Sequence, residues 1–279
     1  MPGNLQLIKR RIRTANNIFQ IAKAMETIAA SKIKRAKKSV EANKPYTEKI
    51  TNMVENILNI IDTENYQHPF LIKNQSEKKL IVTIGTDRGL CGILIPNILK
   101  KLLNFDTQNT YMITIGKKIA RAAVKLDFEL IASFPMGSSL PKYSVIYPVL
   151  EIINQYYINK KISEVYILFT EFKSFFTQTP TIQKLLPVEI KKSVSTEYTN
   201  YIFEPEIEII LKELLPYYVE VKLYNTIINS YTSEQAARMV SMQKAKNNAL
   251  DVSDSLTLIY NKIRQEKITN EILDITNTQ

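Results

Sequence analysis

Apolar residues near the N-terminus recur at alternating steps of three and four positions, which is the pattern of a helix that packs along one stripe against another helix. The pattern is interrupted at Glu26 and at the polar positions Asn43 and Thr47, and it then resumes in the same phase. The apolar positions are Leu5, Ile8, Ile12, Ala15, Phe19, Ala22, Ala29, Ile33, Ala36, Val40, Ile50, Val54, Ile57 and Ile61. The pattern predicts one helix over about residues 4–61, with Asn4 as its N-cap.

Residues 205–279 carry the same alternating steps, interrupted at Gln235 and Arg238. Pro205 suits the first turn of a helix, because the amide hydrogen it lacks would have no partner there. The apolar positions are Ile207, Ile210, Leu214, Tyr217, Val221, Tyr224, Ile228, Tyr231, Met242, Ala245, Ala249, Val252, Leu256, Ile259 and Ile263. A second helix of roughly sixty residues is therefore predicted.

Two apolar stripes at opposite ends of one chain can be buried against each other, and a compact segment between them requires the helices to run antiparallel. The polar breaks select the register, because any other alignment leaves a charge on each helix against apolar residues, at a cost of a few kcal/mol. With Glu26 opposite Arg238, Leu5 lies level with Ile259. We therefore predict Glu26 and Arg238 as the pair that sets the register of the coil, and a helix that protrudes alone beyond Ile263.

In the middle of the chain, the spacing of the apolar residues changes. Short β-rich apolar runs predict strands at 79–86, 110–116 and 164–172, and helical patterns occupy 117–126 and 144–159. This alternation predicts a Rossmann-like α/β domain. The predicted fold class is thus α/β with long helices, an antiparallel two-helix coiled coil plus a central α/β domain. The predicted boundaries are 1–62 for the N-terminal helix, 76–200 for the central domain and 205–279 for the C-terminal helix.

Positive charge is concentrated in the first helix. Residues 1–50 hold twelve Lys and Arg against three Glu, which is +9 of a net charge of +10. The densest cluster is Lys32, Lys34, Arg35, Lys37 and Lys38. Such asymmetry is typical of a chain with a polyanionic partner, namely nucleic acid, a membrane surface or an acidic protein. A merely solvated helix face remains the alternative.

The composition of the chain argues against several other classes of protein. No stretch reaches the roughly 18 consecutive apolar residues of a membrane span, and the N-terminus lacks the apolar core of a signal peptide. We therefore expect an intracellular chain that is soluble by itself. The single cysteine, Cys91, excludes an internal disulfide, and the single histidine, His68, leaves no zinc cluster to assemble. We expect no metal and no cofactor.

The loop GTDRGLCG at 85–92 directly follows a predicted strand, and its glycines could cradle a phosphate. Its spacing matches neither the Walker pattern nor Gly-x-Gly-x-x-Gly. We therefore predict a tight turn fixed by an ion pair between Asp87 and Arg88, with phosphate binding as the alternative. Other carboxylates in this region have no base or nucleophile in matching positions, so no active site is predicted. They are Asp127, Glu129 and Glu171.

Four motifs resemble the gamma subunit of F-type ATP synthases, and the resemblance covers nearly the entire chain. They are AMETIAASK at 24–32, TDRGLCG at 86–92, PTIQKLLP at 180–187 and SEQAARMVSMQKAKNNA at 233–249. The resemblance implies a rotor in the central stalk, whose coiled coil is threaded through alternating alpha and beta subunits and whose globular part binds the epsilon subunit and the c-ring. It implies a membrane-associated role in proton transport and ATP synthesis, without catalysis by this chain.

The resemblance also assigns residues. Lys32, Lys34, Arg35, Lys37 and Lys38 would face an acidic loop of beta, and Met25 and Arg238 would lie where the shaft meets beta. Asn270 and Leu273 depart from the Gln and Thr common in the family, and one glycine is missing after Cys91. The implied location is the cytoplasmic face of a bacterial inner membrane, with the mitochondrial matrix face as the alternative.

Two other classes stay in view. A nucleic-acid-binding coiled coil would use the basic helix, but it would carry basic residues on both arms, whereas charges over 205–279 nearly balance. A nucleotide-binding α/β enzyme would use the glycines at 85–92, but it would need a proper glycine fingerprint. The rotor is therefore the favoured function, and nucleic acid is not an expected partner.

Overall fold

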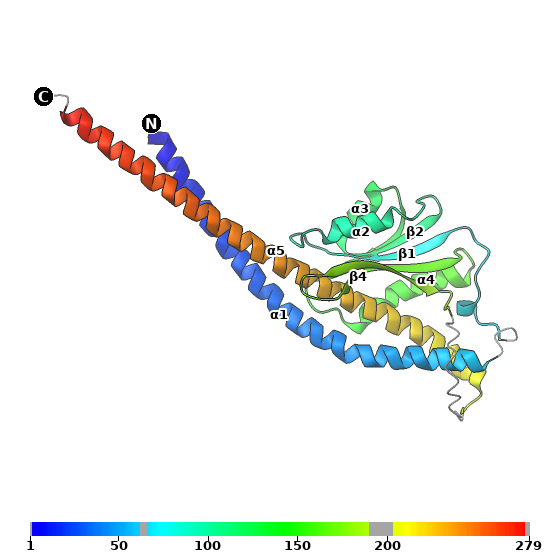
Figure 1. The fold of residues 1–279 in the computed structure, drawn as a ribbon. Helices are drawn as coiled ribbons and strands as arrows, with labels where there is room; N and C mark the ends of the chain where they lie inside the picture. Colours follow the sequence, from blue (N-terminus) through cyan, green and yellow to red (C-terminus); the bar gives the residue numbers. More distant parts are fainter. Residues whose placement is uncertain (1, 62–65, 190–202, 277–279) are drawn as a thin grey trace. The chain divides into compact units, whose positions relative to one another are not determined.

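The computed structural model describes residues 2–61, 66–189 and 203–276. Two long helices come from the ends of the chain: α1 (Pro2–Ile60, 59 residues) and α5 (Ile207–Thr276, 70 residues). Between them in the sequence, the described residues form a five-stranded sheet and three shorter α-helices. Figure 1 shows these elements. The predicted fold class, two long terminal helices with a central α/β domain, is confirmed.

The sheet has the strand order β3-β2-β1-β4-β5, in which all neighbours are parallel except β4 and β5. The strands are β1 (Lys79–Ile84), β2 (Thr110–Ile115), β3 (Glu129–Phe134), β4 (Glu164–Phe172) and β5 (Gln178–Leu186). The three predicted strands are β1, β2 and β4. The two edge strands, β3 and β5, were not predicted. Pro180 weakens the strand pattern of β5, and an edge strand tolerates it because one side of the strand needs no ladder partner.

Helices cover both faces of the sheet. On one face, α2 (Leu94–Leu102) and α3 (Lys117–Lys125) pack against alternate strand residues such as Ile81 and Met112. On the other face, α4 (Tyr147–Ile158) and parts of α1 and α5 share a core with Val82. The helix predicted at 117–126 is α3. The one predicted at 144–159 is α4, preceded by a 3-10 turn at Tyr143–Ile146. Helix α2 was not predicted.

The chain divides into two compact units, one built from residues up to Ser31 together with those from Arg238 onward, and one built from Lys32–Ala237. This division cuts across both long helices. The sequence-based boundaries at 1–62, 76–200 and 205–279 follow the elements instead and stay a prediction. In the first unit the predicted stripe of α1 is buried at Ile8, Ala15, Ala22 and Ala29. Small residues at these positions allow the two helices to approach closely.

Two details of the long helices differ from the prediction. The first helix begins at Pro2 rather than after Asn4, since proline is well tolerated at the start of a helix. On α5, Val252 and Ile259 are 51% and 47% exposed, whereas Ser253 is 6% exposed. The stripe after Met242 therefore contains Ser253 in place of Val252. The prediction favoured the more apolar residue, but a hydroxyl with a hydrogen-bond partner is equally compatible with burial.

Two glycines bring the ends of β1 and β2 together. A Cβ on Gly116 would lie 2.8 Å from the backbone carbonyl of Gly85, and the φ of +124° at Gly116 disfavours any other residue. A Cβ on Gly85 would lie 2.0 Å from a side-chain carbon of Ile119 on α3. The glycine at the start of the 85–92 loop therefore serves close packing of the backbone at this edge of the sheet.

Candidate interaction surface

Four of the five basic residues predicted as a contact surface lie on the exposed face of α1. The four, which we call the basic face, are Lys34, Arg35, Lys37 and Lys38. Ile33 and Ala36, on the opposite side of the helix, are 2% and 0% exposed and hold it to the core. Lys37 Nζ lies 3.5 Å from Glu41 Oε1, an exposed pair worth a few tenths of a kcal/mol. The basic face therefore presents its charge to solvent, where an acidic partner can reach it.

Lys32 has a different environment. It is half-buried, and its Nζ donates a hydrogen bond of 2.6 Å to the backbone carbonyl of Ser138, in the loop after β3. The chain's own loop thus engages the ammonium group. The predicted role of Lys32 in contacting another subunit stays a prediction.

Met25 and the two residues of the predicted register pair, Glu26 and Arg238, are partly or fully covered. Met25 and Glu26 are half-buried, and Arg238 is 6% exposed. Glu26 Oε2 lies 2.8 Å from Lys246 Nζ, so a lysine of α5 neutralises this carboxylate. The pairing of Glu26 with Arg238 stays a prediction, as does the contact of Met25 and Arg238 with another subunit.

Polar contacts between α1 and α5 locate the register inside each unit. In the first unit, Ser253 Oγ donates to Asn16 Oδ1 over 2.9 Å, and Glu26 pairs with Lys246. The predicted alignment, with Glu26 opposite Arg238, would place earlier residues of α5 opposite Asn16 and Glu26. Their partners Ser253 and Lys246 lie roughly one to two helical turns farther toward the C-terminus. The predicted alignment is wrong for these two contacts. It was selected on the assumption that the charge of Glu26 would be unpaired unless it faced Arg238, whereas Lys246 pairs with Glu26. In the second unit the Tyr46 and Tyr217 hydroxyls bond to each other, within one residue of the predicted alignment.

The Asp87 carboxylate, predicted to pair with Arg88, instead accepts three backbone hydrogen bonds. Its Oδ1 accepts from the amides of Lys117 at 2.9 Å and Met136 at 3.2 Å, and its Oδ2 accepts from Gly137 at 2.8 Å. Burial alone would raise the pKa of Asp87, but these hydrogen bonds outweigh it and lower the pKa. Because Lys117 begins α3, the carboxylate occupies the position at a helix N-terminus where a phosphate would bind.

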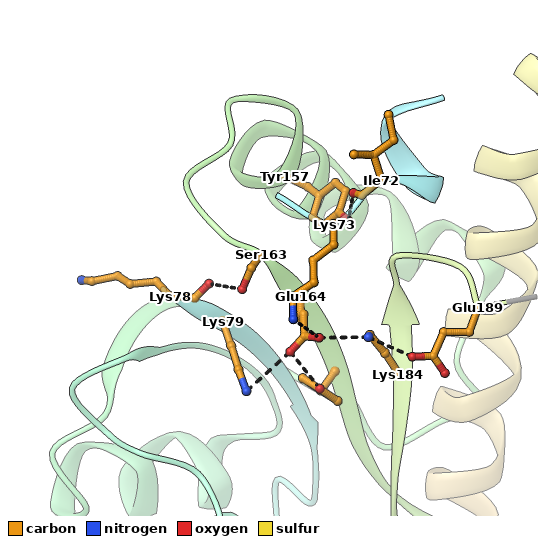
Figure 2. A network of polar contacts seen from close by, with 10 residues as sticks. Ile72, Lys73, Lys78, Lys79, Tyr157, Ser163, Glu164, Lys184 and Glu189 are labelled. Carbon is orange, nitrogen blue, oxygen red and sulfur yellow. Dashed lines mark hydrogen bonds and ion pairs between the residues drawn. The ribbon is translucent and has the colours of Figure 1, made fainter. Parts of the chain in front are cut away.

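A buried carboxylate, Glu164, joins the amino ends of β1 and β4 to the carboxyl end of β5, as Figure 2 shows. It begins β4 and is 5% exposed. Its oxygens lie 2.9 Å from Lys184 Nζ on β5, 3.2 Å from Lys73 Nζ and 3.5 Å from Lys79 Nζ at the start of β1. The Tyr166 hydroxyl donates a further hydrogen bond of 3.0 Å. These contacts join β1, β4 and β5.

The electrostatics of Glu164 follow from these partners. Burial by itself would raise the pKa of Glu164, but hydrogen bonds from Lys184, Tyr166 and Lys73, with the charge of Lys184, lower it to about 2. Burial by itself would lower the pKa of Lys184, but its hydrogen bonds to Glu189 and Glu164 raise it. This network was not predicted from the sequence. Its signal was a glutamate at the head of an otherwise apolar strand, but the lysines that approach it come from segments far apart in the sequence.

Other features expected from composition can be placed. His68 Nδ1 accepts a 3.1 Å hydrogen bond from the Phe70 amide and so caps a short 3-10 turn. Over the parts of the chain that the structure describes, no helix has the length and apolar character needed to cross a membrane. Within those same ranges, no three His, Cys, Asp or Glu side chains gather where they could hold a metal ion.

The fold defines a class of protein in which both chain ends form long paired helices and the middle forms a small α/β domain. The family model described as ATP synthase matches residues 4–278. An ATP synthase gamma chain from Dehalococcoides mccartyi is 38% identical over 276 residues, covering 98% of this chain and 97% of the relative. The gamma chain of Chloroflexus aurantiacus is 35% identical over 285 residues, covering 99% and 98%.

Solved structures agree with these relatives at the level of the fold. A chain of the Euglena gracilis mitochondrial ATP synthase, solved with OSCP, F1 and the c-ring, superposes with a TM-score of 0.73 at 20% identity, covering 100% of this chain and 94% of that chain. The chain belongs to the family of ATP synthase gamma chains.

Proposed function

We propose that this chain is the central rotor shaft of an F-type ATP synthase, which couples proton-driven rotation of a c-ring to ATP synthesis at the beta subunits. The observation that carries the proposal is the pair of long helices in a member of the gamma-chain family. At about 1.5 Å per residue they are roughly 90 and 105 Å long, which is enough to reach through a ring of subunits. The chain transmits rotation and catalyses no reaction itself.

The basic face is the proposed contact with an acidic loop of beta, and Met25 and Arg238 are proposed to act where the shaft meets beta. Exposed ion pairs contribute only about 0 to 1 kcal/mol each. Contacts of this strength hold a partner loop near the shaft without a deep energy minimum at one rotation angle. The function therefore needs charge on an exposed helix face, which Lys34, Arg35, Lys37 and Lys38 provide.

The proposed partners are the alpha and beta subunits around the shaft, and the epsilon subunit and c-ring at the globular part. No nucleic acid is among them. The chain would reach the membrane through the complex, as a peripheral subunit on the cytoplasmic face of a bacterial inner membrane. The bacterial origin of the 38% identical relative supports this location over a mitochondrial one.

Purification from the source cells tests the assignment. An affinity-tagged copy of the full chain, extracted in mild detergent, is expected to bring down alpha and beta subunits that hydrolyse ATP, with untagged cells as the control. Recovery of the folded chain without either subunit, from membranes that retain ATP synthase activity, would contradict the rotor function.

A further inference from the structure

The loop between β3 and α4 contacts both long helices within the unit Lys32–Ala237. We call residues 136–143 the strap. The backbone carbonyl of Ser138 accepts two hydrogen bonds, from Lys32 Nζ of α1 at 2.6 Å and from the Tyr231 hydroxyl of α5 at 3.4 Å. One point of the strap therefore binds both helices.

The rest of the strap follows α5. The Tyr224 hydroxyl donates to the carbonyl of Pro141 over 3.2 Å, and the Tyr143 hydroxyl donates to Glu220 Oε2 over 3.2 Å. The rings of Tyr143 and Tyr224 also meet edge to face, with centroids 4.8 Å apart. As the strap advances from Ser138 to Tyr143, its partners on α5 recede from Tyr231 to Glu220. The strap thus runs antiparallel along roughly three turns of the helix.

Asp87 fixes the other end of the strap to the sheet. The carboxylate binds the amides of Met136 and Gly137, the first two strap residues, and the amide of Lys117 at the start of α3. Hydrogen bonds to an ionised acceptor are about twice as strong as neutral ones. Gly137 has a φ of +80°, which glycine adopts without strain. The ends of β1, β2 and β3 and the strap are therefore joined at one carboxylate.

We propose that the strap is a path by which load passes between the sheet and the two long helices, and that Asp87 is the positioning residue that fixes its sheet end. The load-bearing role rests on the proposed rotor function, whereas the attachment rests on geometry alone. Apolar packing between sheet and helices resists separation but has no preferred direction, so it resists sliding weakly. The strap bonds are directional and act at several levels of α5. A further bond, from Ser233 Oγ to the Thr170 carbonyl at 2.9 Å, assists them.

Hydrogen exchange in the full chain tests the attachment. Asp87→Asn replaces one carboxylate oxygen with an amide nitrogen that cannot accept a hydrogen bond, and exchange of the Met136 and Gly137 amides, which the carboxylate binds, is expected to accelerate at least tenfold. Asp106→Asn is the matched control, because Asp106 also accepts a backbone hydrogen bond, from Gln108 at 3.1 Å, but lies in a different loop. Unchanged exchange in Asp87→Asn would show that Asp87 does not hold the strap.

Proton pumping per ATP hydrolysed, measured in the reconstituted complex, tests the load-bearing role. Asp87→Asn is expected to lower this ratio at least threefold while hydrolysis stays within twofold. Tyr143→Phe combined with Tyr224→Phe should also lower it, because the two changes remove the hydrogen bonds that join the strap to α5 at Glu220 and Tyr224 and so loosen its helix side. A variant with all three substitutions should pump no fewer protons per ATP than the more impaired of these two variants, because both variants loosen the same strap. A normal pumping ratio in Asp87→Asn, together with accelerated exchange of its strap amides, would overturn the load-bearing role. A loss in the triple variant equal to the sum of the losses in the two separate variants would overturn it as well. The rotor function itself would stand if the wild-type complex still pumps.

Discussion

Reversing Lys34, Arg35 and Lys37 to glutamate is expected to reduce ATP-driven proton pumping by the reconstituted complex at least tenfold, because like charges facing the proposed acidic loop of beta would cost several kcal/mol. The three side chains are exposed, and burial of this part of α1 depends on Ile33 and Ala36. Loss of the pair between Lys37 and Glu41 costs only a few tenths of a kcal/mol. Folding should therefore survive while assembly or torque fails.

Thermal unfolding of the isolated chain and pumping by the complex separate these effects. A matched charge reversal at three exposed lysines of α2 and α3 serves as the control. They are Lys100, Lys101 and Lys125. We expect the control to pump within about twofold of wild type. If the α1 variant also hydrolyses ATP and pumps normally, the basic face has no role in coupling.

Glu164→Gln is expected to destabilise the α/β domain by about 3 kcal/mol at neutral pH. The pKa of Glu164 falls from 4.5 to about 2 on folding, and a tenfold change in proton affinity corresponds to about 1.4 kcal/mol. Glutamine keeps the shape but leaves Lys184, which is only 20% exposed, without this partner. Denaturant unfolding followed by circular dichroism measures the loss.

The pH dependence of the same variant has a definite sign. Because folding lowers the pKa of Glu164, its ionised form stabilises the domain above pH 4.5, and the benefit is lost as the pH falls toward about 2. Wild type and Glu164→Gln should therefore converge between about pH 5 and pH 2. A difference that stays constant over this range would mean that the charge of Glu164 contributes nothing.

Two comparisons sharpen the test of Glu164. Glu129→Gln removes an exposed carboxylate paired with Lys78 at 3.2 Å, and it should cost no more than about 1 kcal/mol. Adding Lys184→Met to Glu164→Gln should recover part of the loss, because it removes a partly buried ammonium that lost this partner.

Sequence periodicity predicted the long helices because their burial depends on a repeat that runs along one continuous segment. Ala15, Ala22 and Ala29 of α1 and Met242 and Ala249 of α5 are buried where the steps of three and four place them. The same method erred at Val252, since hydrophobicity ranks valine above Ser253, whereas the structure pairs Ser253 with Asn16. Periodicity identifies the buried side of a helix more reliably than the contacts made there.

Contacts between segments far apart in the sequence could not be predicted in this way. Asp87 binds amides up to fifty residues away, and nothing near it in the sequence indicates that β2 and β3 end at the same edge. The partner of Glu26 was not predicted for a related reason. Glu26 was assumed to need Arg238, but the long side chain of Lys246 reaches it from another turn of α5. Among the candidate site residues, only exposure of the basic face followed directly from the helical pattern.

Direct observation of rotation tests the central claim that this chain is the rotor. Cys91 is the single cysteine of the chain, so Cys91→Ser with Phe176→Cys, at a position that is 79% exposed, gives one site for an optical marker. With the beta subunits immobilised and ATP supplied, we expect the marker to turn stepwise in one direction and to stop when hydrolysis is inhibited. A marker that stays fixed relative to the beta subunits during undiminished ATP hydrolysis would contradict the account.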